Sequence, residues 1–284
     1  MATLKLAALS LCLIASTPAF AGTSSTCTGK TGQPGSFQLS IESGGIPRTY
    51  RLHVPAQYDP TANTPLLLSF HGVTSSGQQM EEGTKIIPRS DSAGFIVAHP
   101  DGYGASWNAG WCCAPASTED IDDVQFSRDL VAAISQAYCI DPARVYAMGF
   151  SNGAFMSNRL GCEAADLFAA IGSHSGEIAI QSCAPSRPMP VYHIHGRTDT
   201  VVPWRLGQES VKEWADLNGC STSTTPVYEK GVASCVVYSG CPGQAQVEFC
   251  TVKRFGHDWA MYENTGDAID ATDQIWDFMK DRTL

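Results

Sequence analysis

Short apolar segments recur along most of this 284-residue chain, and segments with helical spacing lie between them. An apolar run of this length, bounded by turn residues, is typical of a strand that is buried on both faces of a sheet. Strands buried on both faces occur mainly in parallel sheets, because helices must cover both sides. We therefore expect strands at residues 50–54, 65–70, 95–99, 145–150, 168–173, 191–195 and 247–253.

Helices are predicted in the intervals between these strands. Residues 123–138 place four aliphatic side chains near one helical face, and residues 154–160 continue directly from a strand; residues 208–217 and 268–280 are further candidates. Such alternation predicts an α/β fold class, with a mostly parallel, doubly wound sheet flanked by helices and functional groups at the carboxyl ends of the strands. Residues 222–246 are rich in Ser, Thr, Gly and Cys, and we interpret them as a disulfide-tied excursion.

The amino-terminal residues have the pattern of a secretory signal peptide. Lys5 precedes an apolar stretch, and Ala19, Phe20 and Ala21 form a small-residue cleavage pattern before Gly22. We assign residues 1–21 to a signal peptide and residues 22–284 to a single domain, because no linker or repeat divides them. The protein is therefore expected to be secreted and extracellular.

Composition narrows the possible partners. Loss of Lys5 with the signal changes the net charge from -10 to -11, and an acidic surface argues against nucleic acid and anionic membranes as partners. No later segment offers the roughly twenty uninterrupted apolar residues of a membrane-spanning helix. We expect a monomer that needs no cofactor and no metal.

Ten cysteines remain once Cys12 is removed with the signal. An even number in an exported protein predicts as many as five disulfides, and the paired two-residue spacing of zinc sites is absent. Connectivity does not follow from sequence, but short intervening loops favour Cys162 with Cys183 and Cys235 with Cys241.

The motif Gly-x-Ser-x-Gly occupies residues 149–153, with Ser151 at its centre. It follows a predicted strand directly and precedes a predicted helix, so its glycines permit a tight turn that lifts the serine hydroxyl above the sheet. The helix amino terminus would then favour an oxyanion beside that serine. The alternative is an ordinary turn in which Ser151 caps the helix.

A serine needs a base and an acid to become a nucleophile, and folds with this turn supply them in the order Ser, Asp or Glu, His. Asp199 follows the strand at residues 191–195, and His257 follows the last predicted strand. Asp199 and His257 are therefore expected on loops at the carboxyl ends of the strands. His174 precedes Asp199 and breaks the order, whereas His193 and His195 share one strand face, a spacing that suggests either metal ligation or packing.

Acyl transfer also requires amide donors for the oxyanion. Asn152, the residue after the nucleophile, supplies one. The second is expected in the His71-Gly72 turn after an early strand, where we favour the Val73 amide and consider Thr74 the neighbouring candidate and a substrate contact.

Aromatic residues near these segments suggest a substrate wall. Trp107 and Trp111 lie on one predicted loop, and Trp204 and Trp259 are close in sequence to the acid and the base. The alternative for the loop tryptophans is that they cover the core. The acidic run at residues 119–123 suggests either calcium binding or a helix cap.

Several stretches of the chain resemble the secreted feruloyl esterases and the related polyhydroxybutyrate-depolymerase-like esterases. The resemblance rests on Trp111-Cys112-Cys113, Asp122-Asp123-Val124 with Phe126, the motif at residues 149–154, His195-Gly196 with Asp199 and Val202-Pro203, and His257 with Trp259. It implies the α/β-hydrolase fold, with Ser151, Asp199 and His257 as catalytic triad and the Val73 and Asn152 amides as oxyanion hole.

The function implied by this resemblance is hydrolysis of ester-linked hydroxycinnamates, such as ferulate on plant cell-wall arabinoxylan. Alternatives within the family are a polyhydroxyalkanoate depolymerase and an acetyl xylan esterase. An alternative of another class is a carbohydrate-binding protein that retains the fold. Such a protein would be expected to have lost a triad residue, and none of the three positions is lost here.

Overall fold

The computed structural model describes residues 27–284, so the predicted signal peptide lies outside the described residues. In this range no helix has the length and apolar character needed to span a bilayer.

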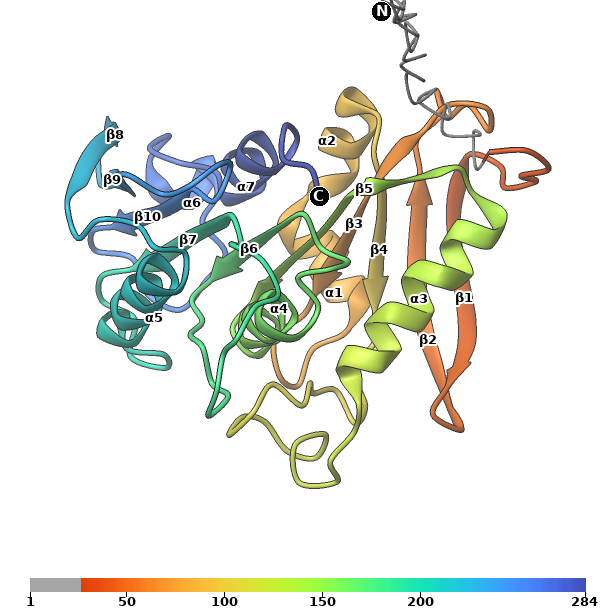
Figure 1. Ribbon diagram of the computed structural model, residues 1–284, viewed down its shortest axis with the longest axis horizontal. Helices are drawn as coiled ribbons and strands as arrows, with labels where there is room; N and C mark the ends of the chain where they lie inside the picture. Colours follow the sequence, from red (N-terminus) through yellow and green to blue (C-terminus); the bar gives the residue numbers. More distant parts are fainter. Residues whose placement is uncertain (1–26) are drawn as a thin grey trace, which may run out of the picture.

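A single ten-stranded sheet forms the centre of the protein, in the order β1-β2-β4-β3-β5-β6-β7-β10-β9-β8 (Figure 1). The six strands from β4 to β10 in this order are parallel, and the strands at both edges are antiparallel. The strands are β1 (Gly35–Ser43), β2 (Ile46–Val54), β3 (Thr64–Phe70), β4 (Ile96–Pro100), β5 (Ile140–Phe150), β6 (Ala170–His174), β7 (Val191–Gly196), β8 (Thr224–Lys230), β9 (Ala233–Tyr238) and β10 (Val247–Val252).

Helices cover both faces of this sheet. They are α1 (Gly77–Thr84), α2 (Ile86–Ala93), α3 (Asp123–Ala137), α4 (Asn152–Glu163), α5 (Trp204–Leu217), α6 (Tyr262–Thr265) and α7 (Ala271–Met279). The apolar residues of α3, α4 and α5 pack in one core cluster, and those of α1, α2 and α7 pack in a second.

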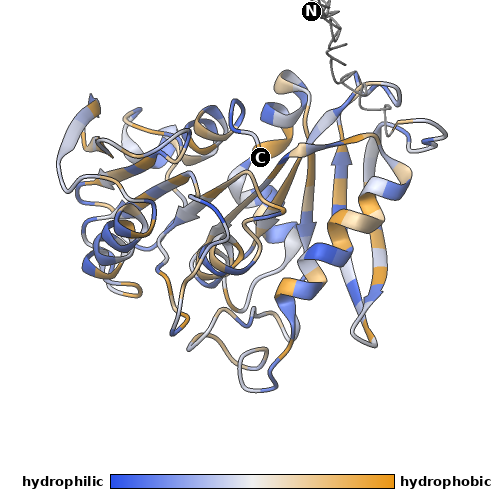
Figure 2. Ribbon diagram, viewed as in Figure 1, coloured by the Kyte–Doolittle hydropathy of each residue, from blue (hydrophilic) through white to orange (hydrophobic). Residues whose placement is uncertain are grey.

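The side chains of each central strand alternate between these two clusters. Leu66 and Leu68 of β3 belong to the first, whereas Leu67 belongs to the second. This alternation is the period-two geometry of a strand, and it explains why the central strands are apolar on both faces. Figure 2 accordingly shows hydrophobic residues along the central strands.

The predicted fold class is confirmed: the chain has an α/β-hydrolase architecture with a mostly parallel sheet, flanking helices and several disulfides. All seven predicted strands and all four predicted helices overlap observed elements. The edge strands β1 and β8, the adjoining strand β9 and the helices α1, α2 and α6 were not predicted.

Residues 222–246, interpreted as a disulfide-tied excursion, are tied by Cys220–Cys241 and Cys235–Cys250, but they also form the hairpin β8–β9, which was not predicted and extends the sheet beyond β10. Strand β8 is exposed along nearly its whole length, so it carries no hydrophobic pattern that a sequence could display.

All ten cysteines outside the predicted signal are paired. The predicted pair Cys162–Cys183 is confirmed. The predicted pair Cys235–Cys241 is wrong, because Cys235 lies directly opposite Cys250 in the ladder between β9 and β10 and is bonded to it. The remaining disulfides are Cys220–Cys241, Cys27–Cys139 and Cys112–Cys113.

Candidate active site

Ser151 occupies a strained turn between β5 and α4. Its backbone has φ 53° and ψ -123°, a conformation that side-chain-bearing residues rarely adopt. The flanking glycines are sterically required, since a Cβ on Gly149 would collide with the Gly153 carbonyl oxygen, and a Cβ on Gly153 with the Phe70 carbonyl oxygen. The Ser151 N–H donates to the His174 carbonyl of the neighbouring strand (3.0 Å).

Of the three residues predicted as a triad, His257 lies within hydrogen-bond distance of both Ser151 and Asp199. His257 Nε2 is 2.9 Å from Ser151 Oγ, and His257 Nδ1 is 2.7 Å from Asp199 Oδ2. Ser151 and Asp199 are buried, whereas the His257 side chain is 15% exposed. Because the Asp199 carboxylate accepts a hydrogen bond from His257 Nδ1–H, it favours the His257 tautomer whose Nε2 is free to accept the serine proton.

The Asp199 carboxylate is saturated with hydrogen bonds. Oδ1 accepts from the Val201 and Val202 amides, each at 2.9 Å, and Oδ2 lies 3.5 Å from His195 Nε2 as well as close to His257. Burial alone would raise the pKa of Asp199, but the hydrogen bonds from His195 and His257 outweigh it and hold this pKa well below its usual value. Asp199 is therefore ionised.

His195 is a neighbour of Asp199 that sequence reasoning did not assign to the site. Its Nε2 lies 2.8 Å from the Val202 carbonyl, which can only accept, so Nε2 carries a proton. His195 Nδ1 then accepts from His193 Nε2 at 3.1 Å. The position of His193 and His195 on one strand face correctly indicated that the two side chains pack together. The four-residue spacing from His195 to Asp199 is the sequence feature that could have indicated their contact.

His174, the competing candidate for the base, is fully buried behind the site. Its Nε2 accepts from the Ala260 amide at 3.1 Å, and its ring stacks on Trp259 at a centroid distance of 4.9 Å. Burial lowers the pKa of His174 well below its usual value. This histidine is therefore neutral, and both of its ring nitrogens are hydrogen-bonded to groups other than the Ser151 hydroxyl.

Two backbone amides near the nucleophile have no hydrogen-bond partner among residues 27–284. They are the N–H of Val73, in the loop after β3, and the N–H of Asn152, in the first turn of α4. The neighbouring candidate, Thr74, has its amide occupied by the Ala105 carbonyl (2.8 Å) and its hydroxyl bonded to the Val73 carbonyl (2.6 Å). Thr74 does not line the cavity beside Ser151.

The prediction that Trp107 contacts the substrate is wrong. Its side chain is fully buried between Phe70 and Phe126, and its indole N–H donates to the His71 carbonyl at 2.8 Å. The Trp107 backbone also exchanges two hydrogen bonds with the Asn152 side-chain amide, at 2.7 and 3.1 Å. Trp107 thus connects the loop that holds Val73 to the turn that holds the serine.

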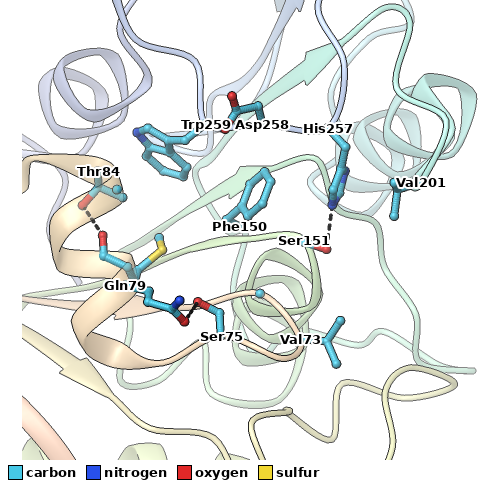
Figure 3. A pocket seen from close by; sticks show the side chains of 13 residues that line it. Val73, Ser75, Gln79, Thr84, Phe150, Ser151, Val201, His257, Asp258 and Trp259 are labelled. Atoms are coloured by element: carbon cyan, nitrogen blue, oxygen red, sulfur yellow. Dashed lines mark hydrogen bonds between the residues drawn. The ribbon is translucent and has the colours of Figure 1, made fainter.

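A cavity of about 370 Å³ opens beside the serine. Figure 3 shows Ser151 and His257 at one end, Phe150 between, and Gln79 and Trp259 toward the other end. The lining is mainly apolar, which suits an acyl group with an extended hydrophobic part. The full set of lining residues is Gly72, Val73, Ser75, Gln79, Met80, Gly83, Thr84, Phe150, Ser151, Val201, His257, Asp258 and Trp259.

Of the four predicted tryptophan contacts, Trp259 is the one that lines this cavity. It is 5% exposed, and its indole N–H donates to the Thr272 hydroxyl at 3.1 Å. Trp204 begins α5 and packs under the Arg197 guanidinium, with its indole N–H on the Thr251 hydroxyl at 3.1 Å. Trp111 lines a separate hollow.

The acidic run at residues 119–123 acts as a helix cap. The Asp122 side chain accepts from the Gln125 amide at the start of α3, and Asp123 forms a buried ion pair with Arg48 (2.8 Å). Among the described residues, the one His, Cys, Asp and Glu group close enough to hold a metal ion is Cys235, Glu248 and Cys250, and its two cysteines are joined in a disulfide.

Comparison with known proteins identifies the family of this chain. Residues 53–237 match the phospholipase/carboxylesterase family, and the chain belongs to that family. The chain is 33% identical over 254 residues to feruloyl esterase B of Piromyces equi, covering 81% of this chain and 44% of that protein. It spans less than half the length of this and of two further curated relatives.

Solved structures share the fold at low sequence identity. An acetyl xylan esterase from Aspergillus awamori superposes with a TM-score of 0.63 at 18% identity, covering 82% of this chain and 97% of that one. A CE1 ferulic acid esterase from Anaeromyces mucronatus, in complex with ferulic acid, gives a TM-score of 0.59 at 16% identity, covering 89% and 92%.

Proposed function

We propose that this chain is a serine carboxylic-ester hydrolase, with Ser151 as nucleophile, His257 as general base and Asp199 as the acid that orients it. The observation that carries the proposal is the continuous hydrogen-bonded series from Asp199 Oδ2 through His257 to Ser151 Oγ, at 2.7 and 2.9 Å. A solvated histidine and a turn aspartate would have no reason to align on one buried serine.

The reaction follows from these positions. Ser151 Oγ attacks the ester carbonyl carbon while His257 Nε2 takes the hydroxyl proton, and the ionised Asp199 stabilises the imidazolium. The Val73 and Asn152 amides donate to the resulting oxyanion, aided by the positive end of α4. His257 then protonates the departing alcohol. Water repeats the sequence on the acyl-enzyme and releases the acid.

The substrate class we propose is the hydroxycinnamate ester, such as ferulate linked to plant cell-wall polysaccharide. The cavity of about 370 Å³ is far larger than an acetyl group, and Phe150 and Trp259 offer aromatic surface to a planar ring. A relative named feruloyl esterase and a fold neighbour solved in complex with ferulic acid support the same choice. Acetyl xylan and polyhydroxyalkanoate esters are the alternatives that the experiment below separates.

We also propose that residues 1–21 are a signal peptide and that residues 22–284 act outside the cell as a single catalytic domain, as a monomer and without a cofactor. Complete pairing of ten cysteines supports an oxidising compartment.

The experiment compares the purified protein with its Ser151→Ala variant on methyl ferulate, methyl acetate and a 3-hydroxybutyrate oligomer. We expect methyl ferulate to have the highest kcat/KM, and the variant to lose on the order of 10⁴-fold or more in kcat with unchanged melting temperature. A variant that retained a tenth of the wild-type rate would refute the nucleophile. A preference for methyl acetate or the oligomer would replace the proposed substrate with one of the alternatives.

A further inference from the structure

A second hollow, of about 770 Å³, lies on the surface near the active site and shares no lining residue with the catalytic cavity. Its walls come from the loop after β4, from α4 and from the segment that follows β6. These are carboxyl-edge elements, so the hollow opens at the same edge of the sheet as the catalytic serine. We call it the Trp111 groove, lined by Asn108, Gly110, Trp111, Asp120, Arg159, Ile178, Ala179, Ile180 and Gln181.

Trp111 is exposed to an unusual degree for a tryptophan, since 68% of its surface is accessible. It is nevertheless held in place. Its backbone N–H donates to the Ala179 carbonyl at 3.2 Å, its ring lies against Phe155 at a centroid distance of 5.5 Å, and its neighbour Cys112 is fixed by the disulfide to Cys113. The indole therefore presents a flat apolar face that would lose little conformational entropy when a ligand covers it.

Polar groups of both signs surround this indole. The Arg159 guanidinium donates to the Asn108 carbonyl at 2.7 Å and pairs with Glu163 at 3.1 Å, so its charge is already balanced. Asp120 and Gln181 line the groove and are exposed. A groove with hydrogen-bonding edges, one apolar platform and a carboxylate, but no unpaired cation, fits a neutral polyhydroxylated molecule better than an anion or a purely apolar one.

The groove is physically connected to the nucleophile. Phe155, on which Trp111 packs, donates its backbone N–H to the Ser151 carbonyl at 3.0 Å. Asn152 Nδ2 lies 4.0 Å from Cys112 Sγ, next to Trp111 in the chain. Phe155 thus contacts both Trp111 and the backbone of the nucleophile, and the groove is lined by residues that the acyl cavity does not use.

We infer that the Trp111 groove is a subsite for the neutral sugar chain that carries the ester. A pyranose or furanose ring would lay its C–H face on the indole, while its hydroxyls bond Gln181, Asp120 and Arg159. This inference rests on the proposed function, because it assigns the alcohol side of the ester to the groove and the acyl side to the cavity.

The test separates sugar binding from ester chemistry. Rates are measured on methyl ferulate and on a feruloylated arabinoxylo-oligosaccharide for the wild type, Trp111→Ala, Trp111→Phe and Gln181→Ala. Tyr262→Ala, which removes an exposed aromatic residue on α6, is the matched control. Binding of ester-free xylohexaose and soluble arabinoxylan to the same proteins is measured by calorimetry and by retardation in a polysaccharide-containing gel.

We expect Trp111→Ala to lower kcat/KM on the feruloylated oligosaccharide by about fivefold to tenfold, mainly by raising KM. The value of kcat/KM for methyl ferulate should change by less than about twofold. Xylohexaose binding should weaken in parallel, Trp111→Phe should recover part of it, and Tyr262→Ala should change neither. Equal losses on both esters, or sugar binding unaffected by Trp111→Ala, would overturn the subsite.

The same measurements keep this inference distinct from the proposed function. If the wild type bound xylohexaose through Trp111 but did not hydrolyse ferulate esters, the proposed acyl group would fail while the sugar subsite stood. If methyl ferulate were hydrolysed but no variant altered sugar binding, the subsite would fail while the esterase stood.

Discussion

The two sides of the candidate site are held in place by different means. On one side, Asp199 is fixed by the Val201 and Val202 amides of its own loop, and the adjoining Thr198 amide bonds the Phe255 carbonyl beside His257. On the other side, the Val73 loop depends on Trp107, which reaches it from 36 residues away.

This difference has consequences for how each side responds to substitution. The proposed acid–base side is a set of short loops after β7 and β10, and a change there is expected to act directly on the proposed reacting groups. The oxyanion side is assembled by buried side chains after β3 and β4, so a change there acts through position. The predictions below test that contrast.

The largest effect is expected for Asp199→Asn on the acid–base side. An amide has no negative charge to stabilise the imidazolium, and if its one oxygen accepts from the Val201 and Val202 amides, an NH2 donor faces His257 Nδ1 and disfavours the required tautomer. We therefore expect kcat to fall on the order of 10³- to 10⁴-fold with little change in KM. Combining it with Ser151→Ala should lose no more than Ser151→Ala alone, because the residues act as a unit. Additive losses in the double variant would mean that Asp199 acts elsewhere.

An intermediate effect is expected for Trp107→Phe on the oxyanion side. The substitution leaves the buried His71 carbonyl without the indole N–H, which should let the Val73 loop shift. We expect kcat to fall about 10- to 100-fold with KM nearly constant, because displacement of one oxyanion donor weakens transition-state binding. Stopped-flow burst amplitudes with an activated ester would show the loss in acylation.

Trp214→Phe provides the control for that variant. Trp214 is equally buried, and its indole N–H donates to the Asn158 side chain at 2.7 Å, away from the Val73 loop. Both variants should lose about 1–3 kcal/mol of stability from an unsatisfied buried acceptor. If Trp214→Phe lowered kcat as much as Trp107→Phe does, the effect would be one of general destabilisation, and the contrast between the two sides would not hold.

The same contrast explains what the sequence could predict. The order of Ser151, Asp199 and His257 and their position after strands are local features, and the structure brings these three side chains together. The burial of Trp107 depends on Phe70, His71 and other residues far away in the chain, so no local pattern distinguishes it from the exposed Trp111.

The edges of the fold show the same limit. Central strands are apolar on both faces and were predicted, whereas β8 is largely exposed and β9 is its one strand neighbour. The Cys235–Cys250 disulfide depends on the pairing of β9 with β10, which places the two residues opposite each other. Cysteine spacing alone favoured the shorter and incorrect loop.

The smallest effect, and the most selective, is expected for Gly83→Leu, on the helix that follows the Val73 loop. Gly83 lines the cavity, and a Cβ built on it meets no heavy atom within 4 Å, so a leucine side chain can enter the empty space. Filling the far part of the cavity should exclude a hydroxycinnamoyl ring but leave room for an acetyl group at Ser151. We expect kcat/KM for methyl ferulate to fall about tenfold, the equivalent of roughly 1.4 kcal/mol, while kcat/KM for methyl acetate changes by less than about twofold.

Gly83→Ala should give a smaller loss in the same direction, and Glu82→Leu, an exposed position on the same helix, should give none. Equal losses on both esters would mean that the leucine displaces the Val73 amide. The acyl cavity and the oxyanion loop could then not be altered independently. An unchanged ferulate rate would place the acyl group outside this part of the cavity.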